Sequence, residues 1–544
     1  MKKNKFCILI DKINKKIFLD DNELFEDVII TESIVQDTKY KVEINDDKFV
    51  FYNSEFGFNK VYYQDFLNKL IITNDINLLD IKRFDPKGIS SILMFGYVLP
   101  NTSLYDGILA LPPRTKLHID LGNYTYDVSY ERLPNTNNLE SNVNDIKNIL
   151  TLKNDEQNAY LMSGGRDSRV IACLNKSKLK KTFTFKLNGF LPDEMDNHQV
   201  DSYKNDIKGT NFKCFLDSND DEVINSYKIS TEESFDHVHA GRWKFDYFIK
   251  KITRNNSNKY KFVNGQTADT IISLNLTGDN FSSRIRRASF YGGIEHTLIK
   301  NCLKLASGIF SKINNKYTPY FKGIVNCNSH SEYYSGYLVN NIEFPGVEVK
   351  KKQFFYSILG ENLTNSVYKK INELIETKNN LYTSDEKHLM MLDVCLNTFI
   401  WGMDMRGLRE ACHRYGHETN FIFMKDTVIS KILSLPKSYT SPLSDYKKVL
   451  KDIEKEFINE IYENPIKEFK TTLDMQTSFE SIILSGVLGE YWRGVVKTDE
   501  FIEFVDYVFN EYEISIGDIS VTVDNYSYID RVISLFFWYK KYIV

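Results

Sequence analysis

The pattern of hydrophobic and polar positions differs between the first part of this chain and the rest. In the first part, short segments such as Phe49–Tyr52 and Lys116–Asp120 have the alternation of a strand. A period of two puts apolar side chains on one face of a strand. Segments of this kind, separated by turns, predict a layered, β-rich region.

After residue 150 the pattern predicts buried strands and amphipathic helices. The apolar run Ala159–Met162 ends in Ser-Gly-Gly, and from Asp167 onward apolar residues recur at helical spacing. This order predicts a strand, a tight turn and a helix. Two later segments, Phe183–Lys186 and Tyr260–Val263, are typical of further parallel strands. Helices are also expected over Leu408–Glu418 and Val521–Val544.

The length of 544 residues exceeds one compact domain. The clearest loop signal is Pro134-Asn135-Thr136-Asn137-Asn138. We therefore expect two domains, 1–135 and 143–544. The first is expected to be α+β with layered β-sheets, and the second α/β, with a parallel sheet and many helices.

Composition removes several classes of function. The net charge is −4, with Lys and Arg spread along the chain, so no nucleic-acid partner is expected. The seven cysteines form no Cys-x-x-Cys pair, which argues against zinc and a disulfide scaffold. No apolar run approaches the roughly 20 residues of a membrane helix, and no signal peptide is recognised. These features predict a cytoplasmic protein without a membrane partner.

The turn Ser163-Gly164-Gly165 carries the most informative chemistry. Because glycines leave the backbone accessible, its N–H groups can surround an anion at the positive end of the following helix. Ser163 and Ser168 add hydroxyl donors, and Asp167 adds a carboxylate that could hold a metal bridging phosphate oxygens. No Gly-Lys-Ser/Thr follows, so this is not a Walker loop. The alternative is a glycine turn that binds nothing.

This segment resembles the Ser-Gly-Gly-x-Asp-Ser pyrophosphate loop of N-type ATP pyrophosphatases, in particular the asparagine synthetase family. Enzymes of that family bind ATP, adenylate a carboxylate and release pyrophosphate. Two later segments are similar to family motifs. In Asn264–Asp269, Gly265, Ala268 and Asp269 match the second nucleotide motif. In the segment that begins at Glu418, Glu418 and Phe423 match a further family motif, whereas Asn420 and Ile422 do not.

The resemblance implies ATP and Mg²⁺ as cofactors and assigns residues to them. Asp167 and Asp269 would hold the metal. The residues expected to contact ATP are Met162, Ser163, Gly164, Gly165, Asp167, Ser168, Phe185 and Gly265.

The region before residue 135 resembles the glutaminase domain of the same family without its nucleophile. Glutamine-dependent members carry a Cys directly after the initiator Met, whereas this chain has Lys2 there. Cys7 lies inside an apolar run and is expected in a buried strand. A degenerate Ntn glutaminase-like fold is therefore implied. Family members that take an amine directly include β-lactam synthetases and lasso-peptide macrolactam synthetases.

Two residues are assigned catalytic roles by the resemblance. Lys470, with Lys467 in reserve, would stabilise charge as the acyl-adenylate forms and reacts; the alternative is a solvated lysine. Gln266 stands where the family has a glutamate. A glutamine cannot act as a general base, so deprotonation would fall to Glu232, Glu233 or a tyrosine, or the reaction would differ.

Two polar clusters can be interpreted either as functional sites or as ordinary structural features. Cys412, His413 and His417 could bind a metal, but a helix face bordering the active site is favoured. The other cluster could bind substrate or simply begin a helix; it comprises Asp236, His237, His239 and Arg242.

The sequence therefore predicts an ATP-dependent amide synthetase that releases AMP and pyrophosphate and does not hydrolyse glutamine. The expected substrate is a small molecule or a peptide, joined as a macrolactam, lactam or amide, and a partner that processes a precursor peptide is a further expectation. Alternatives are an ammonia-dependent asparagine synthetase and a catalytically inactive nucleotide-binding relative. A tRNA-modifying ATP pyrophosphatase is disfavoured.

Overall fold

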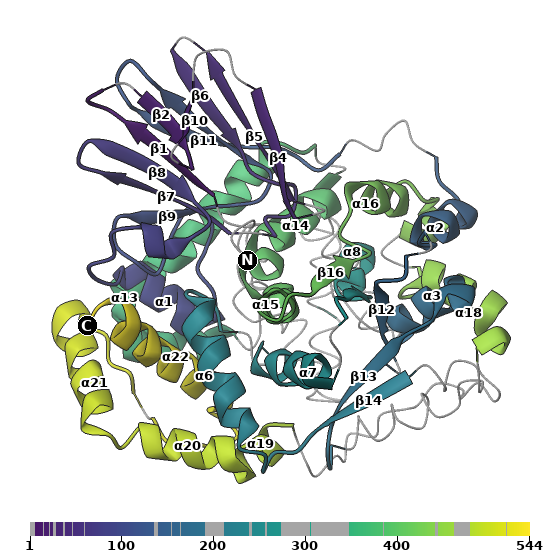
Figure 1. Ribbon diagram of the computed structural model, residues 1–544. Coiled ribbons are helices and arrows are strands. Elements are labelled where there is room, and N and C mark those ends of the chain that lie inside the picture. Colours follow the sequence, from purple (N-terminus) through teal and green to yellow (C-terminus); the bar gives the residue numbers. More distant parts are fainter. Residues whose placement is uncertain are drawn as a thin grey trace.

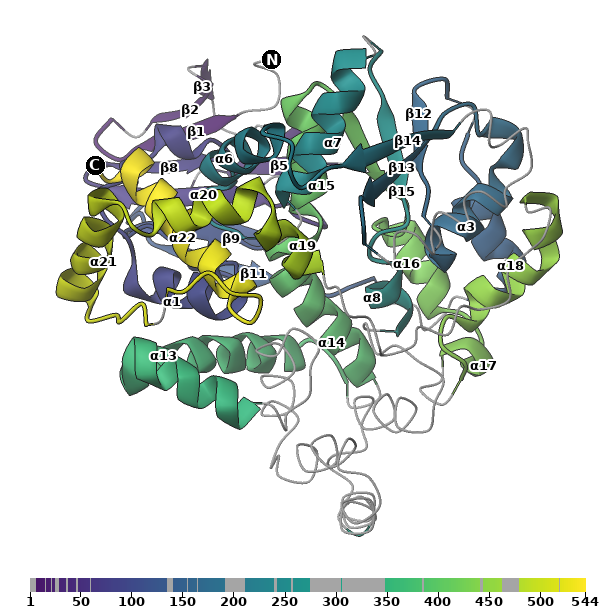
Figure 2. The ribbon, with the colours of Figure 1, turned by 90° about the horizontal axis from the view of Figure 1, so that it is seen from below.

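The computed structural model shows two regions side by side (Figures 1 and 2). One is rich in β-strands, and the other, which is larger, consists of helices around a separate sheet. The structure describes residues 6–14, 16–20, 22–24, 29–35, 38–45, 47–58, 60–134, 140–153, 155–163, 165–190, 211–238, 242–255, 258–273, 305, 348–383, 386–440, 444–461, 479–517 and 519–544.

Two antiparallel sheets form the first region. One has the order β3-β2-β1-β8-β7-β9, and the other has the order β11-β10-β6-β5-β4. Their strands are β1 (Cys7–Asp11), β2 (Lys16–Leu19), β3 (Asn22–Leu24), β4 (Ile29–Val35), β5 (Thr38–Asn45), β6 (Lys48–Tyr52), β7 (Val61–Phe66), β8 (Lys69–Thr73), β9 (Ile108–Leu111), β10 (Thr115–Asp120) and β11 (Tyr126–Tyr130). The predicted strands at 49–52 and 116–120 are confirmed as β6 and β10.

The two sheets enclose a core of their own. In β10 the side chains alternate between buried and half-buried, so that Leu117 and Ile119 face inward with Phe49 and Phe51 of β6. Strand β7 is buried on both faces: Tyr63 joins this core, whereas Tyr62 joins the larger core of the helical region. The β-rich region is therefore packed tightly against the rest of the chain.

The second region is built on a parallel sheet of order β14-β13-β12-β15-β16. Its strands are β12 (Asn158–Leu161), β13 (Thr182–Leu187), β14 (Asn211–Leu216), β15 (Lys261–Asn264) and β16 (Glu418–Phe421). All three strands predicted between residues 159 and 263 are present and parallel. The chain adds β13 and β14 on one side of β12, then β15 and β16 on the other. The β12/β15 junction is thus the point where strand order reverses, which is where open parallel sheets bind ligands.

Helices surround this sheet. Helix α7 packs on β14 and α15, α15 packs on β16, and α3 packs on α18. The helices are α1 (Pro86–Phe95), α2 (Val143–Leu150), α3 (Arg166–Leu174), α6 (Glu222–Ser234), α7 (Arg242–Asn255), α8 (Ala268–Ser273), α13 (Glu348–Asn379), α14 (Lys387–Cys395), the π-helix η6 (Leu396–Asp404), α15 (Arg406–Arg414), α16 (Asp426–Leu433), α17 (Lys437–Thr440), α18 (Lys448–Ile461), α19 (Phe479–Ser485), α20 (Val487–Val495), α21 (Asp499–Tyr512) and α22 (Tyr526–Tyr542).

Two predicted helices have different limits in the structure. The helix expected over 408–418 is α15, which ends at Arg414 because Gly416 takes a left-handed φ of 79° and Glu418 begins β16. The helix expected from Val521 begins only at Tyr526. The β-branched run Val521-Thr522-Val523 that precedes it disfavours helical backbone.

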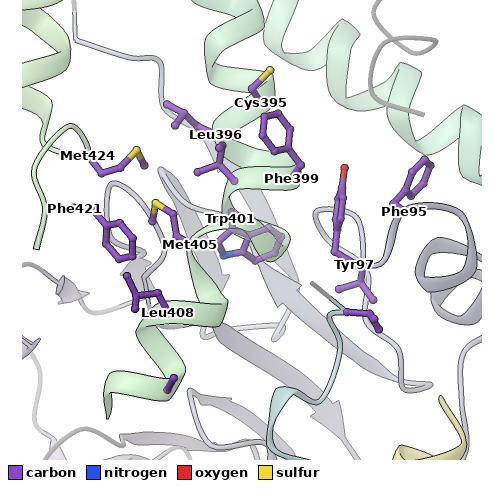
Figure 3. Close-up of a cluster of buried hydrophobic side chains, with 14 of the residues drawn as sticks. Phe95, Tyr97, Cys395, Leu396, Phe399, Trp401, Met405, Leu408, Phe421 and Met424 are labelled. Carbon is purple, nitrogen blue, oxygen red and sulfur yellow. The ribbon is translucent and has the colours of Figure 1, made fainter. Parts of the chain in front are cut away.

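A π-helix of the second region packs against the β-rich region. Helix η6 packs Trp401 and Phe399 into the large core beside Tyr97, which follows α1 (Figure 3). Gly402 permits this approach, because a Cβ there would lie 2.5 Å from the Tyr97 ring. Asp404 is the last residue of η6, so the β-rich region helps to fix the position of that carboxylate.

Among the described residues, no helix has both the length and the apolar character that crossing a bilayer requires.

Candidate functional site

A cavity of about 290 Å³ lies at the carboxyl ends of β12 and β15, where the strand order reverses. It is lined by Leu161, Met162, Ser163, Gly165, Asp167, Ser168, Phe183, Phe185, Phe245, Asn264, Gly265 and Gln266. The structure therefore gathers eight of the residues selected from the sequence around one space. Gly164 and Lys470, as well as the reserve Lys467, lie outside the described residues.

The loop after β12 is held by its own hydroxyl groups. The Ser168 hydroxyl donates to the carbonyl oxygens of Ser163 and Gly165, 2.9 Å in each case, and accepts from the Ser163 N–H at 3.1 Å. The Gly165 N–H donates to the Ser163 Oγ at 3.1 Å. This network fixes the loop before any ligand binds.

Helix α3 begins at this loop without a side-chain cap. Its N-cap residue is Gly165, which provides no side-chain cap for the first turn of the helix. Unsatisfied N–H groups and the helix dipole make such an end attractive to anions. Because the cavity opens at this end, an anionic group bound there would meet the positive pole of α3.

Gly265 allows the end of β15 to lie directly on the first turn of α3. A Cβ at position 265 would lie 2.8 Å from the Asp167 Cβ and 3.0 Å from the Asp167 carbonyl carbon. No residue larger than glycine fits there without displacing α3. The adjacent Thr267 has a φ of 73°, which is rare for a β-branched residue. This loop is therefore strained where it borders the cavity.

Lys447 lies between the two carboxylates that the sequence assigns to a metal. Its Nζ is 2.5 and 2.6 Å from the two carboxylate oxygens of Asp167 and also contacts the Asp269 carboxylate, to which the Tyr446 hydroxyl donates. The Lys447 side chain is only 6% exposed, and its backbone is left-handed with φ 52°. We therefore treat this lysine, which a strained backbone buries between two acids, as a candidate functional residue.

Electrostatics at this cluster favour bound cations. Burial raises the pKa of Asp167, the Lys447 ammonium opposes that rise, and the Asp269 carboxylate adds to it. The two carboxylates converge on one positive atom, and carboxylate oxygens are also the preferred ligands of Mg²⁺. The donor set thus fits the ion implied by the sequence. Within the described part of the chain, no group of three or more His, Cys, Asp or Glu side chains forms a metal site.

Gln266 contacts Asp404 at the end of η6. The Gln266 Nε2 donates to the Asp404 backbone oxygen at 2.5 Å and to its Oδ1 at 3.2 Å. Burial raises the pKa of Asp404 to about 6, the hydrogen bond from Gln266 lowers it, and the Asp269 carboxylate raises it. Asp404 is therefore a carboxylate able to accept a proton near neutral pH, held in place by a side chain that cannot do so itself.

Part of the cavity wall is aromatic. Phe185 of β13 stacks on Phe248 of α7 with ring centroids 4.5 Å apart and planes 6° from parallel. Phe183 and Phe245 also line the cavity. Flat apolar walls of this kind suit a planar ring such as a nucleobase.

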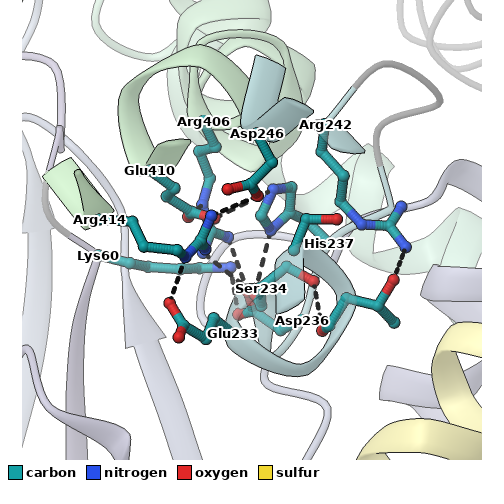
Figure 4. A network of polar contacts seen from close by, with 12 residues as sticks. Lys60, Glu233, Ser234, Asp236, His237, Arg242, Asp246, Arg406, Glu410 and Arg414 are labelled. Carbon is teal, nitrogen blue, oxygen red and sulfur yellow. Dashed lines mark hydrogen bonds and ion pairs between the residues drawn. The ribbon is translucent and has the colours of Figure 1, made fainter. Parts of the chain in front are cut away.

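Several residues considered from the sequence lie away from this cavity. Glu233 pairs with Arg414. His417 accepts a hydrogen bond from the Tyr260 N–H on one ring nitrogen and contacts Thr253 with the other, at 3.0 Å. Cys412 is buried. His239 lies outside the described residues. The other three members of its cluster are buried (Figure 4): Asp236 pairs with Lys60 and Arg406, His237 lies near Glu410, and Arg242 pairs with Asp530.

Sequence reasoning missed Lys447. Its one signal is the pair Lys447-Lys448 at the start of an amphipathic run, because the positive end of a helix disfavours cations. The hydrogen bond that brings Gln266 and Asp404 together has no sequence signal, since the two residues are far apart in the chain and meet only in the fold.

Comparisons with known proteins do not identify a family: no protein-family model matches the chain, and no similar sequence is found among curated proteins.

Proposed function

We propose that this protein is an ATP-dependent amide synthetase that adenylates a substrate carboxylate and transfers the acyl group to an amine. One observation carries the proposal: a single cavity at the strand-order reversal is lined by the start of α3, by Asp167, which contacts Lys447, and by Gln266, which is hydrogen-bonded to Asp404. This set combines an anion site, a cation site and a proton acceptor. The β-rich region is proposed to be a degenerate Ntn glutaminase-like domain.

In the first step, an oxygen of the substrate carboxylate attacks the α-phosphorus of ATP, and pyrophosphate leaves. The N–H groups at the start of α3 and the Lys447 ammonium face the charge that develops on the leaving group. Asp167 and Asp269 would hold Mg²⁺, which neutralises phosphate charge when bound. The adenine ring would lie against the aromatic wall around Phe185.

In the second step, an amine attacks the acyl carbon of the adenylate, AMP leaves, and the amine loses a proton. Asp404 is the acceptor that the geometry favours, because its carboxylate accepts a hydrogen bond from Gln266, a residue that lines the cavity. This assigns the proton transfer to Asp404 rather than to Glu233, which pairs with Arg414. Gln266 acts by orienting Asp404.

The first test is the release of pyrophosphate from ATP in the presence of candidate carboxylates. We expect release with the correct carboxylate and none with the Asp167→Asn variant, whose circular dichroism spectrum should match that of the wild type. A variant that turns over like the wild type would contradict the role of Asp167. Supplying ammonium or an organic amine then tells an ammonia-dependent synthetase from an amine-dependent one.

A second candidate function is nucleotide binding without chemistry. It is favoured by Lys447, whose ammonium contacts both carboxylates and already supplies a positive charge between them. ATP binding that is independent of Mg²⁺, together with no pyrophosphate release from any carboxylate mixture, would support this candidate.

A further inference from the structure

A buried carboxylate joins helices α3 and α18, which lie side by side (Figures 1 and 2). The Glu454 side chain of α18 is only 8% exposed, and each of its two oxygens accepts a hydrogen bond from a different arginine of α3. Arg166 Nε donates at 2.8 Å and Arg169 Nε at 2.5 Å. We call these three residues the α3–α18 cluster. None of them lines the cavity, and the proposed reaction uses none of them.

Electrostatics explain why the α3–α18 cluster holds the two helices in register. Arg166 and Arg169 are three residues apart on α3, where like charges repel, and both lie at the positive end of that helix, which disfavours cations. Glu454 offsets both charges, and the arginines supply the partners that a buried carboxylate requires. Moving α18 along α3 would separate these charges.

The same register determines where Lys447 lies. Lys447 directly precedes α18 and comes about two helical turns before Glu454. Its ammonium contacts Asp167, in the first turn of α3, and Asp269. Since Arg166 and Asp167 are consecutive residues, the start of α3 is attached to α18 both at Lys447 and at Glu454.

From this geometry we infer that Glu454 is a positioning residue, which holds α18 on α3 so that the Lys447 ammonium lies between Asp167 and Asp269. Without the α3–α18 cluster, the flexible stem of the lysine would let its ammonium leave the two carboxylates. The inference deepens the proposed function, and it rests on that function for the role of Lys447 toward ATP.

The first test follows the position of Lys447 and needs no ATP. Acetic anhydride acylates accessible lysine amines, and tandem mass spectrometry of the peptide that contains Lys447 and Lys448 tells the two apart. In the wild type the buried Lys447 should react more slowly than Lys448, which is about one-third exposed. Glu454→Gln should speed the acylation of Lys447 severalfold and leave Lys448 unchanged. Acylation of Lys447 at the wild-type rate, or an equal rise at both lysines, would overturn the inference.

The variants are chosen to keep the helix packing. Glu454→Gln preserves the volume of the side chain but presents an amide NH₂ to one of the two arginines. The arginines themselves are left unchanged, because both have further interactions. Glu456→Gln on the same helix is the matched control: Glu456 is half-exposed and pairs with Lys147, so neither lysine should react differently. If Glu454→Gln does not fold, Glu454→Asp replaces it, since aspartate keeps the charge but is one methylene shorter, and the same outcomes then decide.

The second test measures ATP binding by calorimetry. Glu454→Gln should weaken ATP binding about tenfold, the size of one lost charge-assisted contact. In the Lys447→Met background the same change should have no further effect, because the residue through which Glu454 acts is already gone. Equal weakening in both backgrounds would overturn the inference. If the wild type binds no ATP, the proposed function fails, while the acylation rates still decide whether Glu454 positions Lys447.

Discussion

Replacing Lys447 by methionine tests the cation cluster without knowledge of any substrate. Methionine keeps most of the volume of the lysine stem but removes the ammonium that contacts Asp167 and Asp269. The two carboxylates would then face each other without a counter-charge. The change should therefore lower the stability of the free protein and raise the affinity of the two carboxylates for another cation.

The size of the effect follows from burial. Removing one partner of a fully buried ion pair costs roughly 3–5 kcal/mol. The Asp167 side chain is 20% exposed and that of Asp269 is 40% exposed, so solvent screening reduces the cost to about 2 kcal/mol. The left-handed backbone at position 447 persists in the variant, so no relief of strain offsets this loss.

The assay is thermal unfolding of wild type and variant at pH 7.5 and pH 5, with and without 10 mM MgCl₂ (about 100-fold above an assumed dissociation constant, which would restore about 2.7 kcal/mol). Repulsion raises the pKa of one carboxylate in the folded variant above its unfolded value. The folded variant then binds more protons than the unfolded chain, so its stability falls as the pH rises through that folded pKa. The variant should therefore lie closer to wild type at pH 5 than at pH 7.5.

Lys448→Met is the matched control, because Lys448 forms an i,i+4 pair with Asp452 in which both side chains are about one-third exposed. It should change stability by less than about 0.5 kcal/mol. A Lys447→Met variant whose loss of stability responds neither to pH nor to Mg²⁺ would show that only packing was lost, and the electrostatic argument would be refuted.

Three further predictions concern the cavity at the parallel sheet and the β-rich region. Asp404→Asn should keep carboxylate-dependent ATP–pyrophosphate exchange but slow amide formation by about 10²–10⁴-fold; in the wild type, amide formation should decline as the pH falls through about 6, because the acceptor becomes protonated. A parallel loss of both reactions would contradict its assignment to the second step. Gly265→Ala should cost about 1–3 kcal/mol in urea unfolding, since its Cβ would lie 2.8 Å from the Asp167 Cβ. Gly494→Ala in α20, where a Cβ meets nothing within 4 Å, should be neutral or stabilising, and an equal cost in both variants would argue against the close approach. Cys7→Ser should leave amide formation unchanged, and glutamine should not serve as amine donor; glutamate released from glutamine would point to a retained glutaminase.

The core of the site could be predicted from sequence because it is local. A buried strand, a glycine turn and a helix start are consecutive, so residues 159–174 carried the complete signal for the loop. Strands β13 and β15 followed from short apolar segments, because parallel strands buried on both faces have that pattern. Strand β16 was not predicted, and its first residue, Glu418, was placed at the end of the helix expected over 408–418, since only the structure shows the left-handed backbone at Gly416 that ends the helix earlier.

The remaining part of the site depends on contacts between distant segments. The Lys447 side chain reaches Asp167 because its backbone is left-handed, and no sequence pattern predicts that φ angle. Lys470 was preferred by analogy with a motif, and the role of that position stays a prediction. The buried pairs of Asp236 with Lys60 and Arg406 join three distant parts of the chain, and each of these residues has the appearance of an ordinary surface charge in the sequence.

The packing of η6 on Tyr97 has a consequence for how this protein can change. Gly402 and Tyr97 set the register of η6. Gly57 allows a second close approach, because a Cβ at that position would lie 2.7 Å from the Trp401 indole. The β-rich region thus fixes the position of the helix that ends in Asp404. Separating it from the parallel sheet would remove the support for that carboxylate, so the two halves are expected to tolerate substitutions at their outer surfaces but not a cut between them.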